Sequence, residues 1–270
     1  MKIAFIGCGN MGECILNGLI ESGRYEKENI CVFNRTAETV RRLVAQYGVK
    51  PGNDAADAAA FADVIIVGVK PFAVCPLLES LRDVITEDKI VVSIAAAISM
   101  GSIEKALLHT PRRVVRAMPN VPARVCAGLT SVTANAAVTR AEMELIVELF
   151  GTVGRVVEVS EAQIHAVVGV AGSSPAYVFM FMEAMADAAV HGGLPRTQAY
   201  ELAAQAVLGS ALLLQKSGLT PAQLKDMVCS PGGTTIEAVR SLESGGLRST
   251  VMEAAIACME KSKALETKLN

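Results

Sequence analysis

The segment IAFIGCGNMG at residues 3–12 constrains the fold of this chain more than any other. An apolar run leads directly into Gly7, Gly9 and Gly12 with the spacing G-x-G-x-x-G, and a helical pattern follows without a gap. In such a strand–turn–helix the first glycine permits the tight turn, the second lets a pyrophosphate approach the backbone, and the third lets the helix pack on the strand. The free N–H groups at the helix start favour a phosphate. The segment therefore predicts a dinucleotide-binding βαβ unit.

The first half of the chain alternates apolar, β-branched runs with helical patterns. Continuous apolar runs such as residues 64–67 fit a sheet that is covered on both faces. This alternation is the signature of a doubly wound, mostly parallel sheet, so we predict a Rossmann-type α/β domain at residues 1–159. Strands are predicted at residues 2–7, 30–34, 64–69, 90–94, 114–117, 129–134 and 155–159, and helices at 11–22, 37–47, 71–84, 100–108 and 140–150.

The character of the sequence changes after residue 159. No convincing strand follows, and Ser160 is a good cap for a first helix. Alanine, leucine, methionine and glutamate dominate, with glycine and proline punctuation between helical stretches. Helices such as residues 199–214 are apolar on more than one face, which a small domain cannot bury alone. We therefore predict an all-helical dimerisation domain at residues 160–270.

Composition limits the classes of partner. The net charge is −2 and tryptophan is absent, so neither a nucleic-acid surface nor binding to an anionic membrane is expected. The apolar stretches carry polar residues at intervals too short for a membrane span. Seven scattered cysteines without a C-x-x-C pair argue against a disulfide framework or a metal site. These features favour the reducing cytoplasm.

The ends of the second and third strands indicate which dinucleotide binds. An NAD site usually carries an acid about 20 residues after the glycines, whereas this chain has Asn34 followed by Arg35. A charge-assisted bond from Arg35 to a 2′-phosphate is worth about 1.5–3 kcal/mol, so NADP is favoured and NAD is the alternative. A solvated arginine in a turn is the structural alternative. Residues 68–71 are expected to line the ribose and nicotinamide, and Asn53 or Asp54 to reach the adenosine side.

Three further segments have unusual loop chemistry. The sequence SPGGTT at residues 230–235 places a glycine pair between hydroxyls at a helix start, which suits a small anion such as a carboxylate. A plain helix cap by Thr234 or Thr235 is the alternative. At residues 172–177, Pro175 cannot donate to residue 171, so a kink or helix restart is expected. The two prolines of residues 118–122 stiffen a loop at the carboxyl edge of the sheet.

No side chain stands out as a general acid or base. The three histidines, His109, His165 and His191, are dispersed and are predicted to be surface or cap residues. No lysine occurs between Lys105 and Lys216. A ketone needs a proton as hydride arrives, but a protonated imine already carries its charge, so positioning and hydrogen bonding suffice for its reduction. An imine substrate is therefore favoured.

The motifs IAFIGCGNMG, VGVKP, VRAMPNVPARVCAG, GVAGSSPAYVF, GLPR and SPGGTTIEAV together resemble the pyrroline-5-carboxylate reductase family. The resemblance covers essentially the whole chain, and the last motif is the most specific. It implies reduction of 1-pyrroline-5-carboxylate to L-proline, the final step of proline biosynthesis. It also implies an intertwined dimer, often assembled into a decamer.

The resemblance also implies roles for individual residues. Ser230, Gly232 and the amides of Gly233 and Thr234 would hold the substrate carboxylate, and Thr235, as the catalytic group, would bond the ring nitrogen. The cofactor contacts would be Gly7, Gly9, Asn10, Met11 and Gly12 on the pyrophosphate, Asn34 and Arg35 on the 2′-phosphate, and Val69, Lys70 and Pro71 at the ribose.

Two positions depart from the family pattern. Gly68 stands where alanine is common, and Ser174 stands where many members have glycine, so that Ser174 would narrow the substrate pocket slightly. Neither change touches a group needed for hydride transfer. The helical domain must bring the substrate half of the site over the glycine loop, from the same chain or from its dimer partner.

Two other functions are compatible with parts of the sequence. A related reductase of the β-hydroxyacid or 6-phosphogluconate type would share the nucleotide-binding half, but the missing lysine argues against it. A non-catalytic NADP-binding regulator would leave residues 230–235 without a role. Turnover with hydroxy acids would support the former, and cofactor binding without turnover the latter.

Overall fold

The computed structural model describes residues 1–108 and 112–270. The chain divides into two compact units. The first comprises Met1–Gly172 together with Cys258–Asn270, and the second is Ser173–Ala257. The last helix therefore begins in the second unit and ends in the first. The predicted functional division into residues 1–159 and 160–270 stays a prediction.

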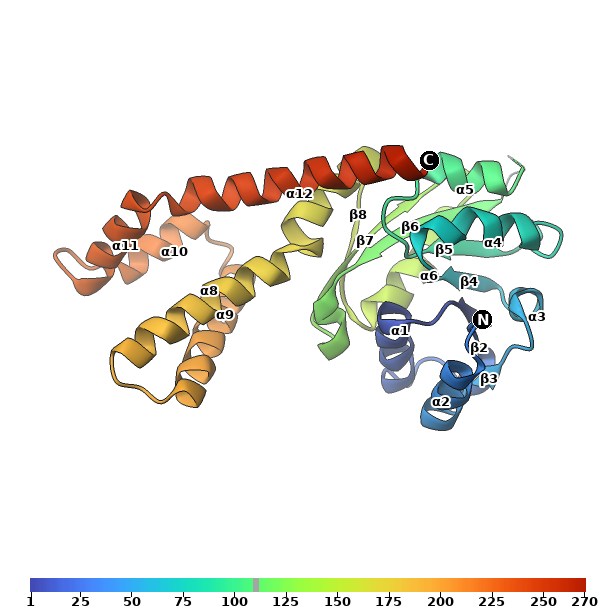
Figure 1. Ribbon diagram of the computed structural model, residues 1–270, viewed down its shortest axis with the longest axis horizontal. Helices are drawn as coiled ribbons and strands as arrows, with labels where there is room; N and C mark the ends of the chain where they lie inside the picture. The colour runs from blue at the N-terminus through green and yellow to red at the C-terminus, as the bar shows by residue number, and fades with distance from the viewer. Residues whose placement is uncertain (109–111) are drawn as a thin grey trace. The chain divides into compact units, whose positions relative to one another are not determined.

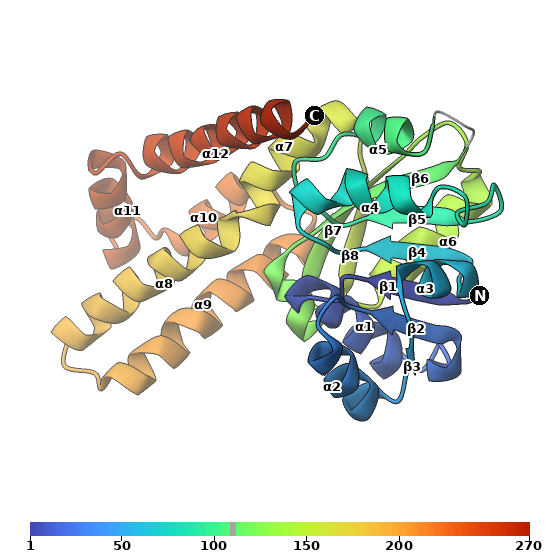
Figure 2. The ribbon, with the colours of Figure 1, turned by 45° about the vertical axis from the view of Figure 1, so that its right-hand side comes forward.

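A mostly parallel sheet forms the centre of the first unit (Figure 2). The described residues contribute eight strands in the order β3-β2-β1-β4-β5-β6-β7-β8. Strand β1, which carries the glycine loop at its carboxyl end, lies between β2 and β4. The strands are β1 (Ile3–Ile6), β2 (Ile30–Phe33), β3 (Lys50–Pro51), β4 (Val64–Val67), β5 (Ile90–Ser93), β6 (Arg113–Pro119), β7 (Gly128–Ala134) and β8 (Gly154–Glu158).

Helices cover both faces of this sheet, because alternate side chains of each strand enter two separate cores. On β1, Ile3 and Phe5 join one core, and Ala4 and Ile6 join the other. The first core is closed by α1 (Asn10–Glu21), α2 (Ala37–Tyr47) and α6 (Arg140–Gly151). The second is closed by α3 (Ala55–Phe61), α4 (Val74–Leu81) and α5 (Met100–Ala106), which lie in front of the sheet in Figure 2. The predicted fold class is confirmed.

Two elements escaped the sequence analysis. Strand β3 is a two-residue edge strand in which Lys50 pairs with Cys31 and Pro51 with Val32. Both of its residues are exposed and one is proline, which only an edge strand tolerates, so it has no apolar pattern to detect. Helix α3 is short and alanine-rich, and its signal is the Asp54 cap, whose carboxylate accepts the Asp57 N–H at 2.7 Å.

Strand β7 runs antiparallel to β6, although it is parallel to β8. Only a short 3-10 turn, η3 (Val121–Val125), separates β6 from β7, and a parallel return needs a crossover of a dozen residues or more. The whole helix α6 provides such a crossover between β7 and β8. Loop length alone therefore explains the change of direction.

The second unit is helical throughout. Helices α8 (Ser174–His191) and α9 (Arg196–Ser217) lie side by side as an antiparallel pair (Figure 1). They are followed by α10 (Pro221–Val228), α11 (Thr234–Ser244) and α12 (Leu247–Leu269). The predicted absence of strands after residue 159 agrees with the helical assignment of residues 160–270.

Candidate functional site

The glycine loop, residues 7–12, connects β1 to α1 through a turn that excludes side chains. Gly7 has φ +86°, and a Cβ placed there would lie 2.6 Å from a methyl group of Val69. The Gly7 N–H donates to the Phe33 carbonyl at 2.8 Å, which ties the loop to the end of β2. A Cβ at Gly9 would meet nothing within 4 Å. Open space at Gly9 is what a pyrophosphate needs to reach the backbone.

Asn34 fixes this loop from the neighbouring strand end. Its side-chain Oδ1 accepts the Cys8 N–H at 2.5 Å, and its Nδ2 donates to the Cys8 carbonyl at 3.2 Å. Both the oxygen and the nitrogen of the Asn34 side-chain amide therefore bond the backbone of Cys8. The direct effect of Asn34 is to fix the conformation of the glycine loop. Burial raises the pKa of the Cys8 thiol to about 12, so this thiol stays protonated and is not a nucleophile.

A cavity of about 850 Å³ opens at the carboxyl ends of β1, β2, β4 and β5, and we call it the strand-end cavity. Two cationic side chains, Arg35 and Lys70, line it, and its lining contains no carboxylate. Among the residues that the structure describes, the Arg35 guanidinium has no hydrogen-bond or ion-pair partner. Its charge is therefore available to an anion, and the donor set fits a dinucleotide with an additional phosphate.

Most of the predicted cofactor residues line the strand-end cavity. These are Gly7, Gly9, Asn10, Met11, Gly12, Asn34, Arg35, Val69, Lys70 and Pro71. Asn53 is outside this lining, and both its backbone and side-chain nitrogens donate to Asp57 Oδ2 at 2.9 Å. The sequence analysis missed Thr36, Phe72, Ala95 and Ala96, which also line the cavity. Their common signal is that each follows the carboxyl end of a parallel strand.

The 230–235 loop belongs to the second unit, where it joins α10 to α11. Gly232 has φ +69°, and a Cβ on Gly233 would lie 2.3 Å from Ser230 Oγ. The Gly233 N–H donates to the Ser230 carbonyl at 3.0 Å, which closes the turn within four residues. Neither Thr234 nor Thr235 is the residue that caps α11, because Gly233 occupies that position and supplies no side-chain bond.

Free donors therefore gather at the start of α11. In the part of the chain that the structure describes, the hydroxyls of Ser230, Thr234 and Thr235 have no hydrogen-bond partner. The first N–H groups of the helix are also without a side-chain cap. Together with the positive end of the helix dipole, these groups form an arrangement suited to a carboxylate.

The expected helix break occurs just before α8. Residues Val168–Gly172 form a π-helical turn, and Ser174 is the first residue of α8. Pro175 has no N–H for the Ala171 carbonyl, and the side chain of Asn120 donates to that carbonyl instead at 2.9 Å. Asn120 Oδ1 accepts the Leu129 N–H at 2.8 Å. Asn120, in the stiff loop of residues 118–122, therefore holds the broken helix against the start of β7.

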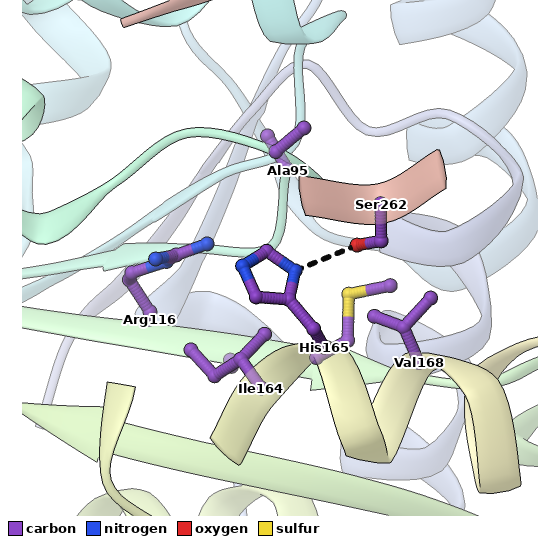
Figure 3. A pocket seen from close by; sticks show the side chains of 9 residues that line it. Ala95, Arg116, Ile164, His165, Val168 and Ser262 are labelled. Atoms are coloured by element: carbon purple, nitrogen blue, oxygen red, sulfur yellow. Dashed lines mark hydrogen bonds between the residues drawn. The ribbon is translucent and has the colours of Figure 1, made fainter. Parts of the chain in front are cut away.

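The His165 side chain is 12% exposed and lies near Arg116 and Ser262 in the first unit (Figure 3). Its Nδ1 lies 2.9 Å from Ser262 Oγ, and its Nε2 lies 3.1 Å from Glu266 Oε2. Arg116, which is 6% exposed, pairs with Glu161 and with Glu266. The cavity beside this cluster measures about 10 Å³, which is roughly the space of one water. The prediction of a surface or cap position is wrong for His165, because residues far apart in sequence surround it.

The other histidines add no candidate. His191 is exposed and ends α8, as predicted. His109 lies outside the described residues. No group of three or more potential metal ligands occurs among the residues that the structure describes.

The second unit exposes a large apolar surface. Phe179, Met180, Leu213 and Met252 are each at least half exposed. A groove of about 590 Å³ between α8, α9 and α10 is lined almost entirely by apolar side chains. The helical stretch Glu161–His191 is long and apolar enough to cross a membrane by length and composition alone, so the expectation that polar residues interrupt the apolar stretches too often for a span is wrong here. Only 17% of its most apolar window is buried. Such a surface requires a partner or an apolar phase.

Two family models match the chain. Residues 161–265 match the model for pyrroline-5-carboxylate reductase dimerisation. Residues 2–97 match the model described as NADP oxidoreductase coenzyme F420-dependent. The first match covers the apolar helices, and it supports self-association as the means by which their surface is buried.

Individual relatives match over almost the full length. Pyrroline-5-carboxylate reductase of Escherichia coli (strain K12) is 51% identical over 264 residues, which cover 98% of each chain. A solved pyrroline-5-carboxylate reductase from Coxiella burnetii superposes with a TM-score of 0.92 at 38% identity, covering 98% of both chains. The pyrroline carboxylate reductase of Plasmodium falciparum, solved with NADP bound, gives a TM-score of 0.88 at 28% identity and the same coverage.

Proposed function

Because this chain belongs to the pyrroline-5-carboxylate reductase family, we propose that the strand-end cavity holds NADPH and that the 230–235 loop holds the substrate. The protein is an NADP-dependent oxidoreductase of proline biosynthesis. The reaction that we assign to these residues is the reduction of 1-pyrroline-5-carboxylate to L-proline. The single observation that carries the cofactor assignment is a cavity of about 850 Å³ with two cationic side chains and no carboxylate.

The cofactor would lie across the ends of four strands. Arg35 and the N-terminus of α2 would hold the 2′-phosphate, since Thr36 caps that helix without a side-chain bond. Gly7, Gly9, Asn10, Met11 and Gly12 would contact the pyrophosphate at the N-terminus of α1, and Val69, Lys70 and Pro71 would flank the ribose. With the adenosine at the end of β2, the nicotinamide must point toward β4 and β5, on the other side of β1. Asn53 would have to release Asp57 to reach the adenosine.

The substrate would bind through its carboxylate. Ser230, Gly232, Gly233 and the amide of Thr234 would surround the carboxylate at the start of α11, where the hydroxyls and N–H groups are free. The Thr235 hydroxyl would bond the ring nitrogen, and Ser174 would line the wall of the pocket. In this assignment the carboxylate accepts from hydroxyl and N–H groups that would be hydrogen-bonded to one another if the loop were only a helix cap.

The chemistry requires little from the protein beyond orientation. Bound NADPH supplies a hydride. The protonated imine accepts that hydride at its ring carbon, the C=N π electrons become the nitrogen lone pair, and the nitrogen keeps its proton. No alkoxide forms that would have to be protonated. The reaction therefore does not need a lysine as general acid, and the sequence has none between Lys105 and Lys216. NADH would react in the same way, with weaker binding because it lacks the 2′-phosphate.

The finer assembly and the location are also part of the proposal. We propose that the helices of residues 161–265 form a homodimer and that dimers assemble into a decamer. We also propose the cytoplasm as the location, which the seven cysteines support because all are free thiols. The apolar stretch Glu161–His191 is then an interface helix and not a membrane span.

Replacing Thr235 tests the substrate assignment. Purified protein should oxidise NADPH only when pyrroline-5-carboxylate is present. Thr235→Ala should lower kcat/KM for that substrate about tenfold to a hundredfold, the loss of one transition-state hydrogen bond, and leave the Kd for NADPH within about twofold. Thr235→Ser keeps the hydroxyl and should retain most activity. An unchanged rate in Thr235→Ala would remove Thr235 from the mechanism, and no turnover by the wild type would overturn the proposal as a whole.

A further inference from the structure

The loop that follows β5 is held in a strained conformation beside the strand-end cavity. We call residues 94–99 the β5 loop. Its residues Ile94, Ala95 and Ala96 line the cavity. The next residue, Ala97, has φ +61°, a left-handed backbone that is unfavourable for a residue with a side chain. A conformation of this kind persists only where the surroundings enforce it.

The side chain of Asn270 bonds the strained residue and the backbone that directly follows it. Its Nδ2 donates to the Ala97 carbonyl at 3.2 Å. Its Oδ1 accepts the Ser99 N–H at 2.9 Å and the Ser99 hydroxyl at 2.9 Å. The two ends of one amide therefore span the backbone from the left-handed residue Ala97 to Ser99, from a position 171–173 residues away in sequence.

The last turns of α12 are anchored so that this amide stays in place. Ser262, Glu266 and Asn270 are spaced by four residues and so share one face of the helix. His165 bonds Ser262 at 2.9 Å (Figure 3) and Glu266 at 3.1 Å, and Arg116 pairs with Glu266 at 2.9 Å. This partly buried cluster, which the reaction itself does not use, thus fixes the helix from which Asn270 reaches the β5 loop.

A simple helix end does not account for these contacts. Asn270 also bonds within its own helix, with its Nδ2 2.5 Å from the Glu266 carbonyl. That bond alone would be enough to finish the helix. The bonds to Ala97 and Ser99 add nothing to the hydrogen bonding of α12, and they fall on the left-handed residue of the β5 loop and on the residue two positions after it.

We propose that Asn270 is a positioning residue for the nicotinamide half of the cofactor. By holding the left-handed turn at Ala97, it keeps Ala95 and Ala96 at the wall of the strand-end cavity farthest in strand order from Arg35. This inference rests on the proposal that the cavity holds NADPH. The adenosine half, bound at the ends of β1 and β2, should not depend on Asn270.

Two ligands allow the two halves of the strand-end cavity to be tested independently. Calorimetric titration of the intact protein with NADPH and with adenosine 2′,5′-bisphosphate, which lacks the nicotinamide half, gives both affinities. Asn270→Ala should raise the Kd for NADPH about tenfold, which corresponds to about 1.4 kcal/mol at 25 °C, and leave the Kd for the bisphosphate within about twofold. An equal loss for both ligands, or no loss for either, would overturn the proposal.

Two further variants distinguish positioning from general destabilisation. Glycine adopts the left-handed conformation without strain, so Ala97→Gly should make the Asn270 hydrogen bonds unnecessary. The double variant Ala97→Gly with Asn270→Ala should therefore bind NADPH within about threefold of the wild type. A double variant as weak as Asn270→Ala would contradict the proposal. Thr267→Ala is the matched control, because it removes one side-chain bond, to the Lys263 carbonyl at 3.1 Å, from the same helix without touching the β5 loop. If the wild type binds neither ligand, the assignment of the cavity has failed, and not the role of Asn270.

Discussion

The two compact units of this chain bury their apolar side chains to very different degrees. The first unit encloses two cores, in which large residues such as Phe5 and Phe150 are no more than 1% exposed. In the second unit, the buried residues among those that the structure describes are Ala186, Ala199 and Ala203. Its leucines, methionines and phenylalanines remain at the surface. The first unit therefore buries its apolar side chains within a single chain, whereas the second unit leaves most of its large apolar side chains exposed.

The contrast follows from how each kind of element buries surface. A sheet between two helical layers covers every strand on both faces, so apolar runs close on one another within a single chain. Helices α8 and α9 pack as one pair, and each keeps a second apolar face that the pair cannot cover. The match of residues 161–265 to a dimerisation family indicates that another copy of the chain covers that face.

The largest effect is expected from a charge placed on this uncovered face. Leu213, on α9, is 51% exposed and lines the apolar groove of the second unit. In a two-fold symmetric dimer each substitution occurs twice in the interface, and an unpaired buried charge costs about 3–5 kcal/mol. Leu213→Glu should therefore weaken self-association by more than about a hundredfold and shift the sedimentation coefficient to that of a smaller species.

The first unit offers a matched control for that charge. Leu145 on α6 is 44% exposed, and Leu145→Glu introduces the same charge at similar exposure. Its sedimentation should equal that of the wild type, since the first unit needs no partner to complete its core. If both variants dissociate equally, the distinction between a complete and an incomplete core is wrong.

A smaller effect is expected where the first unit carries a buried polar link. Asn120→Ala leaves the Ala171 carbonyl and the Leu129 N–H without their partners. At about 1–3 kcal/mol for each of these two groups, the free energy of unfolding should fall by about 2–6 kcal/mol. Because the link lies inside the first unit, this loss should be the same at every protein concentration. The loss caused by Leu213→Glu, measured against a wild type that dimerises, should instead grow with protein concentration.

Chemical denaturation at several protein concentrations checks this difference. Asn120→Asp serves as the intermediate case, since it keeps the acceptor for Leu129 and loses the donor for Ala171. A concentration-dependent loss in Asn120→Ala would mean that the first unit also depends on a partner.

The smallest effect is expected at a partly exposed contact between α1 and α2. Arg42 donates to both carboxylate oxygens of Glu13 at 2.6 and 2.7 Å, and this bonding holds the pKa of Glu13 below its usual 4.5. A lowered pKa means that the stabilisation is present above about pH 4.5 and is lost as the pH falls through the folded-state value. Glu13→Gln should lower the melting temperature by about 1–3 °C at pH 7. The gap should narrow as the pH falls below 4.5, and a gap that stays constant through acid pH would exclude this carboxylate as its source.

The sequence predicted elements best where the pattern is long and regular. Helix α2 was placed at its observed bounds, because its apolar period is clear and Gly48 ends it in a left-handed conformation. Strand β3 was missed because its two exposed residues have no pattern. The direction of β7 was open in the sequence, since strand signals carry no direction, and the length of the connection before it decided the pairing.

Candidate site residues were predictable where one segment contains the whole geometry. The 230–235 loop closes on itself through Ser230 and Gly233, so its turn depends on six consecutive residues, and the role proposed for it stays a prediction. His165 was misplaced as a surface residue because its environment comes from α12, about a hundred residues later. Ala95 and Ala96 were missed since alanine carries no chemical signal, and only the fold brings them to the cavity.

The sequence by itself determined the glycine loop between β1 and α1 and the helical character of the second half, because each depends on residues that are neighbours along the chain. Only the tertiary structure decided that Asn34 holds the glycine loop, that Asn120 satisfies the carbonyl that Pro175 leaves open, and that Asn270 bonds Ala97. Each of these contacts joins a side-chain amide to a backbone group 26, 51 or 173 residues away. Hydrogen bonding is short-ranged and directional, so such pairs become visible only once packing has placed both groups within 3.2 Å.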